Sequence, residues 1–313
     1  MPKKNTRIIQ LLFISTLVTI FTLTGSGCAF KERLSLRTAV PDSALPIVYT
    51  SIYPLYDFTQ KIGGEKITVI NLTPTGAEPH SFEPSPKLLA KLSQASLFLY
   101  NGAGMEPYLE KLLTTLQGEP LLKIKASQGI NEIKENGISD PHFWLSPSCA
   151  LIMGNNILQA LVQIDPNNQT FYEKNFSAFA EKLSELDADY KQALAQCPRK
   201  KIVVTHQAFN YLCREYDLEQ IPIMGLHAEA EPTPGKLKEI SQMMKKEKIK
   251  YLFSEVLYSP KIATTIAQET GATVLQLHPL GSLSQKELEA GKDYLQIMRE
   301  NLQNLQIALE AGP

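Results

Sequence analysis

The sequence is poor in several residue types whose abundance marks a class of protein. Its basic and acidic residues nearly cancel, giving a formal net charge of −1, and no basic stretch carries interleaved aromatic residues. This balance argues against a surface that binds nucleic acid. Only four cysteines occur among the 313 residues, and no two of them form a CxxC pair. A full disulfide framework and a zinc finger are therefore both excluded.

Motifs that mark common enzymes are missing as well. The chain has no HExxH, no GxSxG and no glycine loop that would cradle a phosphate, since Gly102-Ala103-Gly104 reads as an ordinary strand-to-helix turn. We therefore expect a protein that is not an enzyme and that binds its ligand without changing it chemically.

Long apolar runs are confined to the amino terminus. A short basic segment precedes an apolar run over residues 8–23, which is too short for a comfortable permanent membrane span. Small residues and then Cys28 follow. This order predicts a secretory signal peptide over residues 1–27. The mature protein is then extracytoplasmic, either periplasmic or at the cell surface.

Cys28 resembles the lipidated cysteine in the lipobox of bacterial lipoproteins. The resemblance implies that Cys28 becomes the first mature residue and that its lipid anchors the chain to the membrane. Gly25 stands where that motif usually has Leu, so plain cleavage and an uncleaved anchor stay open as alternatives. The other cysteines permit one disulfide in this compartment, but buried free thiols are the favoured interpretation. These cysteines are Cys149, Cys197 and Cys213.

The rest of the chain alternates short β-rich runs with helical stretches, after a polar tether over residues 28–45. Strands separated by single helices form parallel βαβ units, so we predict an α/β fold with two parallel-sheet lobes, 46–167 and 198–313. The predicted strands are 47–51, 66–72, 96–100, 120–124, 201–205, 220–224, 250–253 and 273–277. The predicted helices are 53–62, 86–94, 107–116, 209–216, 235–246, 259–269 and 286–309.

One long helix is predicted between the lobes, over residues 168–197. The segment has no Gly or Pro, and its apolar residues recur in alternating steps of four and three. At 1.5 Å per residue it would extend roughly 40 Å. Because the pattern occurs only once, we interpret it as a rigid helix that joins the lobes and not as part of a coiled coil. Its apolar residues are Tyr172, Phe176, Phe179, Leu183, Leu186, Tyr190, Ala193 and Cys197.

Four of the five histidines fall at comparable places in the two predicted lobes. His206 and His278 directly follow strands of the second lobe, whereas His80 and His142 lie in loops of the first. Ligand sites of parallel α/β sheets form beyond the carboxyl ends of the strands. These four side chains are therefore predicted to meet in a cleft between the lobes. The fifth, His227, is interpreted as an exposed loop residue, with a transient ligand as the alternative.

Four imidazoles at one place predict a site for a divalent transition metal ion. Imidazole suits zinc, whereas manganese prefers carboxylate oxygen as well. A closed set of four nitrogens leaves no position for a water nucleophile, which favours holding the metal over hydrolysis. Glu255, at the end of a strand, is predicted to orient one of the imidazoles, with a surface carboxylate as the alternative. Asp140 and Asp217 are interpreted as turn and surface residues.

Five segments, in order along the chain, resemble the zinc/manganese substrate-binding proteins of bacterial ABC transporters. The resemblance covers residues 46–313 and implies two α/β lobes bridged by a long helix, with His80, His142 and His206 as metal ligands. The segments are Glu-Pro-His-Ser-Phe-Glu-Pro-Ser-Pro (78–86), Asp-Pro-His-Phe-Trp-Leu-Ser-Pro (140–147), Val-Thr-His-Gln-Ala-Phe-Asn-Tyr (204–211), Ala-Glu-Pro-Thr-Pro (230–234) and Leu-His-Pro-Leu-Gly (277–281).

Two departures from that family bear on which metal is bound. Many members have Asp as the fourth ligand, in a motif similar to Asp-Pro-Leu-Gly, where this chain has His278. An all-imidazole set shifts the expectation towards zinc. Many zinc-specific members also carry a His-rich loop, whereas residues 117–139 contain no His here. Manganese and iron therefore stay open as alternatives.

The resemblance also implies a role and partners. The protein would capture the metal ion and deliver it to a membrane permease, whose ATPase subunit supplies the energy. We expect the binding protein to be a monomer. A surface adhesin with a structural metal site is the alternative, because some members of the family have been labelled as adhesins.

Overall fold

The computed structural model describes residues 45–226, 232–257 and 259–310. The predicted signal peptide, Cys28 and the predicted tether up to residue 44 lie outside the described residues, as does His227. No helix in the described ranges is long and apolar enough to cross a membrane.

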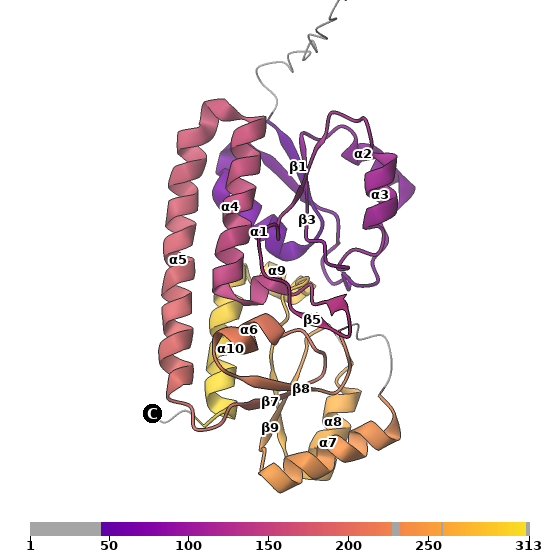
Figure 1. The fold of residues 1–313 in the computed structure, drawn as a ribbon, viewed down its shortest axis with the longest axis vertical. Helices are drawn as coiled ribbons and strands as arrows, with labels where there is room; N and C mark the ends of the chain where they lie inside the picture. The colour runs from indigo at the N-terminus through magenta and orange to yellow at the C-terminus, as the bar shows by residue number, and fades with distance from the viewer. Residues whose placement is uncertain (1–44, 227–231, 258, 311–313) are drawn as a thin grey trace, which may run out of the picture. The chain divides into compact units, whose positions relative to one another are not determined.

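The first lobe is built on a parallel four-stranded sheet in the order β2-β1-β3-β4 (Figure 1). Successive residues of a strand point to opposite faces, and here both faces are covered. Val48 of β1 packs in the cluster that contains α1, while Tyr49 packs with α2 and α3. The elements are β1 Ile47–Thr50, α1 Tyr53–Gly63, η1 Gly64–Lys66, β2 Thr68–Asn71, α2 Pro86–Leu92, β3 Leu97–Tyr100, α3 Leu109–Thr115 and β4 Leu122–Lys125.

The second lobe repeats this plan with a parallel sheet in the order β10-β9-β7-β8. Val203 of β7 and Leu252 of β9 pack against α7 and α8 on one face of the sheet. Two parallel-sheet α/β lobes are thus confirmed. The elements are β7 Lys201–Val204, α6 Asn210–Glu215, β8 Glu219–Pro222, α7 Pro234–Glu247, β9 Tyr251–Ser254, α8 Lys261–Thr270, β10 Thr273–Gln276, α9 Gln285–Glu289 and α10 Tyr294–Ala308.

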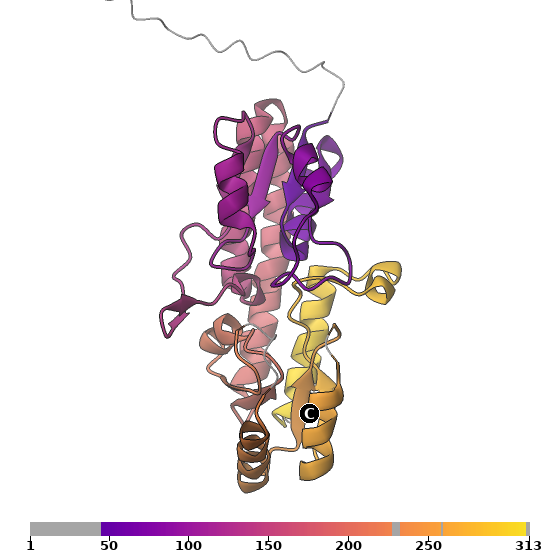
Figure 2. The same cartoon turned by 90° about the vertical axis from the view of Figure 1, so that its right-hand side faces the viewer.

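A long helix, α5 (Gln169–Ala195), confirms the predicted single long helix. It runs beside α4 (Pro147–Ile164) at the first lobe and beside α10 at the second (Figures 1 and 2). Its buried stripe joins one continuous hydrophobic cluster that contains strand residues of both lobes, such as Val48 and Val204. The two lobes therefore share a core. The buried residues of α5 are Tyr172, Phe179, Leu183, Leu186, Tyr190 and Leu194.

Three parts of this architecture differ from the sequence expectation. No helix was expected over α4, because its sequence is apolar on most sides and shows little periodicity. The helix expected over 286–309 is instead two helices, so that prediction is wrong. The break occurs where Gly291 takes a left-handed φ of 67° and Asp293 caps α10 by a reciprocal bond with Gln296. A short hairpin, β5 Lys134–Glu135 and β6 Ile138–Ser139, was also not expected.

Gly154 allows α4 and α5 to approach closely. A Cβ atom at this position would lie 3.2 Å from the Cε2 atom of the Phe176 ring. We expect Gly154→Val to lower the free energy of unfolding by about 1–3 kcal/mol, because the added methyl groups overpack the interface. Urea denaturation measures this change. Gly235→Val is the control, since Gly235 is exposed on α7 and meets only Thr233 Oγ1 at 3.8 Å. Equal losses in the two variants would contradict the packing argument.

Candidate metal centre

His80 lies in the loop between β2 and α2, beyond the carboxyl end of the first sheet. Its backbone N–H donates to Oε1 of Glu78 at 3.2 Å, so a hydrogen bond within the loop holds the backbone at the histidine. The side chain is 9% exposed although it belongs to a loop. A buried polar ring in such a place needs polar partners.

His142 is held by a carboxylate two residues before it, just ahead of η2 (Phe143–Leu145). Oδ1 of Asp140 accepts hydrogen bonds from the backbone N–H of His142 at 2.9 Å and from its Nδ1 at 2.7 Å. Burial lowers the pKa of His142 and outweighs the attraction of Asp140. The ring is therefore neutral near pH 7, with its proton on Nδ1 and a lone pair on Nε2. Asp140 is 1% exposed and accepts two hydrogen bonds from His142, a role that its interpretation as a turn residue did not include.

His206 follows β7, and Glu255 follows the neighbouring strand β9, so the topology places them side by side. Nδ1 of His206 lies 3.0 Å from Oε1 and 3.2 Å from Oε2 of Glu255. Thr205 Oγ1 also donates to this carboxylate, at 3.2 Å. Glu255 thus contacts an imidazole, and its role in orienting a metal ligand stays a prediction.

The charge state of His206 differs from that of His142. Burial by itself lowers the pKa of His206, but the charge and hydrogen bond of Glu255, with a further contribution from Glu78, raise it above the ordinary value. Nε2 of His206 lies 3.2 Å from the carbonyl oxygen of Leu226. Acceptors at both nitrogens are the bonding pattern of an imidazolium ion. A metal ion would have to displace the proton on Nε2.

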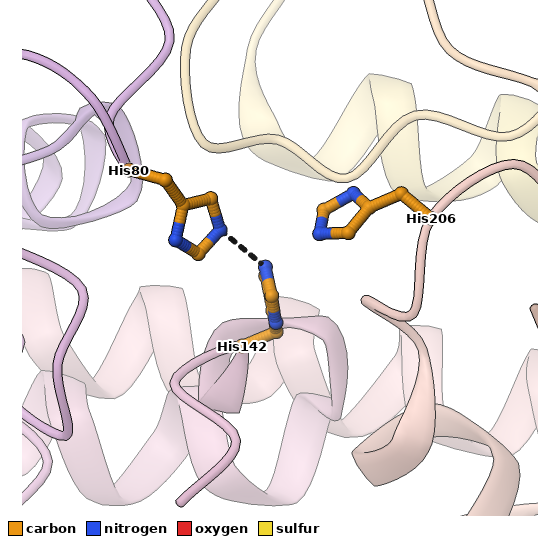
Figure 3. A group of neighbouring side chains, drawn as sticks. All are labelled: His80, His142 and His206. Atoms are coloured by element: carbon orange, nitrogen blue, oxygen red, sulfur yellow. Dashed lines mark hydrogen bonds between the residues drawn. The ribbon is translucent and has the colours of Figure 1, made fainter. Parts of the chain in front are cut away.

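The three rings converge from three separate segments of the chain (Figure 3). Nε2 of His80 lies 3.1 Å from Nε2 of His142, and one ring nitrogen from each histidine falls within 4.8 Å of the others. Zinc–nitrogen bonds of about 2.0–2.1 Å in a tetrahedron separate two ligand nitrogens by about 3.3–3.4 Å. The pair at 3.1 Å is close to this separation, and the three nitrogens lie near enough to one another to share one ion. Within the described residues, no other group of three or more His, Cys, Asp or Glu side chains is close enough to share an ion.

His278 lines the same cavity but lies outside this group of three. Both of its ring nitrogens are hydrogen-bonded to protein atoms. The backbone N–H of Leu280 donates to Nδ1 at 2.8 Å, and Nε2 lies 3.4 Å from Oε2 of Glu287. Its role as a fourth ligand therefore stays a prediction.

The cavity at the centre is small. About 20 Å³ is open to the centre of a water molecule, which is room for about one water or one ion. Glu78, Glu255, Met105 and Trp144 line it together with the four histidines. Asp140 and Glu78 were not predicted as part of the site. Their sequence signal was a carboxylate two residues before a histidine, a spacing that lets it bond to the histidine backbone N–H.

Comparison with known proteins gives the same picture over almost the whole described chain. A family model described as zinc-uptake complex component A, periplasmic (ZnuA), matches residues 48–308. The chain is 37% identical over 310 residues to a zinc-binding lipoprotein, AdcA, of Streptococcus pneumoniae, covering 94% of this chain but only 62% of that protein. It is 35% identical over 277 residues to the high-affinity zinc uptake system protein ZnuA of Bacillus subtilis, covering 84% of this chain and 87% of that protein.

Solved structures agree with the sequence comparison. The crystal structure of the Zn(II)-bound ZnuA-like domain of S. pneumoniae AdcA superposes with a TM-score of 0.78 at 37% identity, covering 85% of this chain and all of that domain. The laminin-binding protein Lmb of Streptococcus agalactiae superposes with the same TM-score at 33% identity, covering 85% of this chain and all of that protein. With the family model matched over both lobes, this chain belongs to the ZnuA family of periplasmic zinc-uptake components.

Proposed function

We propose that the chain captures a Zn²⁺ ion outside the cytoplasm at His80, His142 and His206 and delivers it to an ABC importer. The observation that carries the proposal is the convergence of three buried imidazoles on one ion-sized cavity. Two of these rings are backed by carboxylates, Asp140 and Glu255. Such partners fix the orientation of a ligand imidazole and increase its basicity.

Zinc is favoured over manganese and iron as the transported ion. The three converging side chains offer nitrogen, whereas hard ions such as manganese favour carboxylate and water oxygen. Glu78 and Glu255 also line the cavity, so carboxylate oxygens that suit manganese lie close to the site. Manganese and iron are therefore tested beside zinc. Elemental analysis of protein purified from its native compartment decides the question. Zinc in about one equivalent supports the proposal, and manganese or iron in its place contradicts it.

The site is proposed to bind an ion and not to catalyse a reaction. Three protein ligands can leave a coordination position open, as they do in catalytic zinc sites. Here the cavity has room for about one water or one ion, so a bound ion would leave no space for an organic substrate. Hydrolysis of ester or peptide substrates by the zinc-loaded protein would contradict this interpretation.

The proposed partners are a membrane permease and its ATPase subunit. The Bacillus subtilis relative is named as part of a high-affinity zinc uptake system. We propose a monomer anchored through lipid on Cys28, with domain limits 46–167, 168–197 and 198–313. Deletion of the chain in its own cells should abolish growth under zinc limitation. Wild-type protein should restore growth, and a variant without the three histidines should not.

Adhesion is the second candidate function. It is favoured by the likeness to the laminin-binding protein Lmb of S. agalactiae, which is described as a bifunctional protein with adhesin and metal transporting activity. Laminin is the ligand to test, by binding to an immobilised layer. Laminin binding that persists in a variant without the three histidines would support adhesion independent of the metal. If the wild-type protein does not bind laminin, metal capture is the one of the two candidate functions that remains.

Zinc affinity is expected to fall as the pH decreases. The ion competes with the proton on Nε2 of His206, whose pKa is raised by Glu255, so this competition begins above the ordinary imidazole pKa of about 6.5. His142, with its lowered pKa, stays neutral to lower pH. Competition titrations against a chelator between pH 8 and pH 5, in steps of about half a pH unit, measure the change. An affinity that does not vary over this range would contradict a site built on imidazoles.

Asp140→Asn is expected to weaken zinc binding by about 10- to 100-fold. An asparagine amide can donate to Nδ1 of His142, which would place the ring proton on Nε2, where the metal should bind. Asp217→Asn is the matched control, because Asp217 is exposed at a turn with a φ of 54° that Asn adopts readily. Equal affinities in the two variants, by competition titration, would show that Asp140 does not support the site.

A further inference from the structure

We propose that His278 is a positioning residue and not a metal ligand, and that it holds the turn 278–283 as a clamp on the loop that carries His80. The inference rests on the proposed function, because it concerns the same metal site. The role of His278 as a metal ligand rests on the sequence alone.

The main chain of His278 is fixed to α10. Its backbone N–H donates to Oδ1 of Asn301 at 2.8 Å, and its carbonyl accepts from Nδ2 of the same Asn301 at 2.8 Å. His278 is 5% exposed and Asn301 is 2% exposed, so both bonds are shielded from water. The start of the turn is thus attached to a rigid helix of the second lobe.

The ring of His278 is occupied by protein bonds on both sides. A backbone N–H can only donate, so Nδ1 must present its lone pair to Leu280. Leu280 has a left-handed φ of 62°, a conformation that a side chain of this kind adopts only when its surroundings hold it. Nε2–H points to Glu287, whose Oε2 also accepts from Ser284 at the start of α9. Binding a metal through either nitrogen would break one of these bonds.

The turn that follows His278 bonds to the first lobe at several points. Nε1 of Trp144 donates to the carbonyl of Pro279 at 2.7 Å, and the backbone N–H of Gly76 donates to the carbonyl of Leu283 at 2.7 Å. Weaker bonds at 3.3 Å join Tyr53 N–H to Gly281 and Ser282 Oγ to Pro74. Pro74 and Gly76 belong to the loop that carries His80. The clamp therefore ties this loop to the second lobe.

Gly281 packs against Pro79, the residue that precedes the predicted ligand His80. A Cβ atom at this position would lie 3.0 Å from Cγ of Pro79, the residue just before His80. Only a residue without a side chain lets the turn sit this close. His80 thus takes its place partly from the second lobe, although it belongs to the first. The ion is then held by three imidazoles, with one position left to another donor.

A pair of variants at His278 separates positioning from ligation. The Oδ1 atom of Asn in His278→Asn can accept the Leu280 N–H as Nδ1 does, whereas His278→Ala removes the acceptor. A positioning residue predicts a loss of zinc affinity of about 10- to 100-fold in His278→Ala and a smaller loss in His278→Asn. A ligand predicts similarly severe losses in both variants, because an amide is a poor replacement for a zinc-bound imidazole.

The number of imidazoles bound to zinc is a readout that a change in the stability of the fold does not alter. X-ray absorption of the zinc-loaded protein should show three imidazoles in the wild type, in His278→Asn and in His278→Ala. Four imidazoles in the wild type and three in the variants would overturn the inference while leaving zinc capture intact. Failure of the wild-type protein to bind zinc would instead refute the proposed function.

Gly281→Ala tests the clamp independently of His278. The added methyl must push Pro79, and His80 with it, so zinc affinity is expected to fall by about tenfold with three imidazoles still bound. Gly235→Ala on the exposed part of α7 is the matched control and should bind as the wild type does. Unchanged affinity in Gly281→Ala would overturn the clamp. An unfolding midpoint measured for both variants without metal excludes loss of the fold as the cause of weaker binding.

Discussion

Replacement of His142 by alanine is expected to abolish tight zinc binding. The ring lies at the centre of the group, with Nε2 facing His80 at 3.1 Å and Nδ1 bonded to Asp140 at 2.7 Å. If three imidazoles share a zinc binding free energy of about 10–16 kcal/mol, losing one costs about 3–5 kcal/mol, or roughly a hundred- to several-thousandfold in affinity. The vacated space would admit water, which is a weaker donor.

Competition titration against a chelator of known affinity measures this loss. His80→Ala and His206→Ala should behave in the same way, because each removes one of the three nitrogens. His227→Ala is the matched control, since it removes a histidine that is not proposed as a ligand. Equal zinc affinity in the His142 and His227 variants would refute the site assignment.

The arrangement of the lobes suggests how a captured ion could be retained. The cleft is bridged on one side by the turn 278–283. Elsewhere, Oε2 of Glu215 in α6 accepts from the hydroxyls of Ser146 at 2.7 Å and Ser148 at 2.5 Å, at the amino end of α4. With α5 packed along both lobes, large hinge rotations would break buried contacts. Small tilts of one lobe against the other are therefore the expected motion.

The sequence carried enough information to predict the three histidines that converge. His206 stands one residue after the predicted strand 201–205, and parallel strands end at the same edge of a sheet. The same rule brings Glu255, at the end of β9, next to His206. A rule about strand ends predicts which residues come near one another. It does not predict which nitrogen of each ring faces the centre.

Features that depend on tertiary contacts could not be predicted from the sequence. Whether Asp140 lies in a solvated turn or under His142 depends on packing that no local pattern encodes. His278 has the right place in its lobe, yet Leu280 and Glu287 occupy its nitrogens. Helix α4 lies between the first sheet and α5, so its apolar sides are buried and its periodicity is weak. In each case tertiary contacts override the local signal.

Leu186→Ala is expected to destabilise both lobes together, by about 2–5 kcal/mol. Leu186 is fully buried on α5, in the cluster that contains residues of both sheets. Removing its three terminal carbons leaves a cavity that the rigid helix cannot collapse to fill. Because the lobes share this core, the loss should appear as one cooperative transition shifted to lower urea concentration. Far-ultraviolet circular dichroism follows both lobes, and the fluorescence of Trp144, the one tryptophan, follows the first lobe and its contact with Pro279 of the second.

Leu288→Ala is the matched control, because Leu288 lies on α9 with 47% of its surface exposed. This substitution should change the free energy of unfolding by less than about 0.5 kcal/mol. A chelator must be present in both experiments, since zinc bound only to the folded state would raise the apparent stability of each variant. If the circular dichroism and fluorescence transitions separated, the lobes would unfold independently and α5 would be a tether between two cores. Coincident transitions would show that the helix makes one cooperative unit of the two lobes.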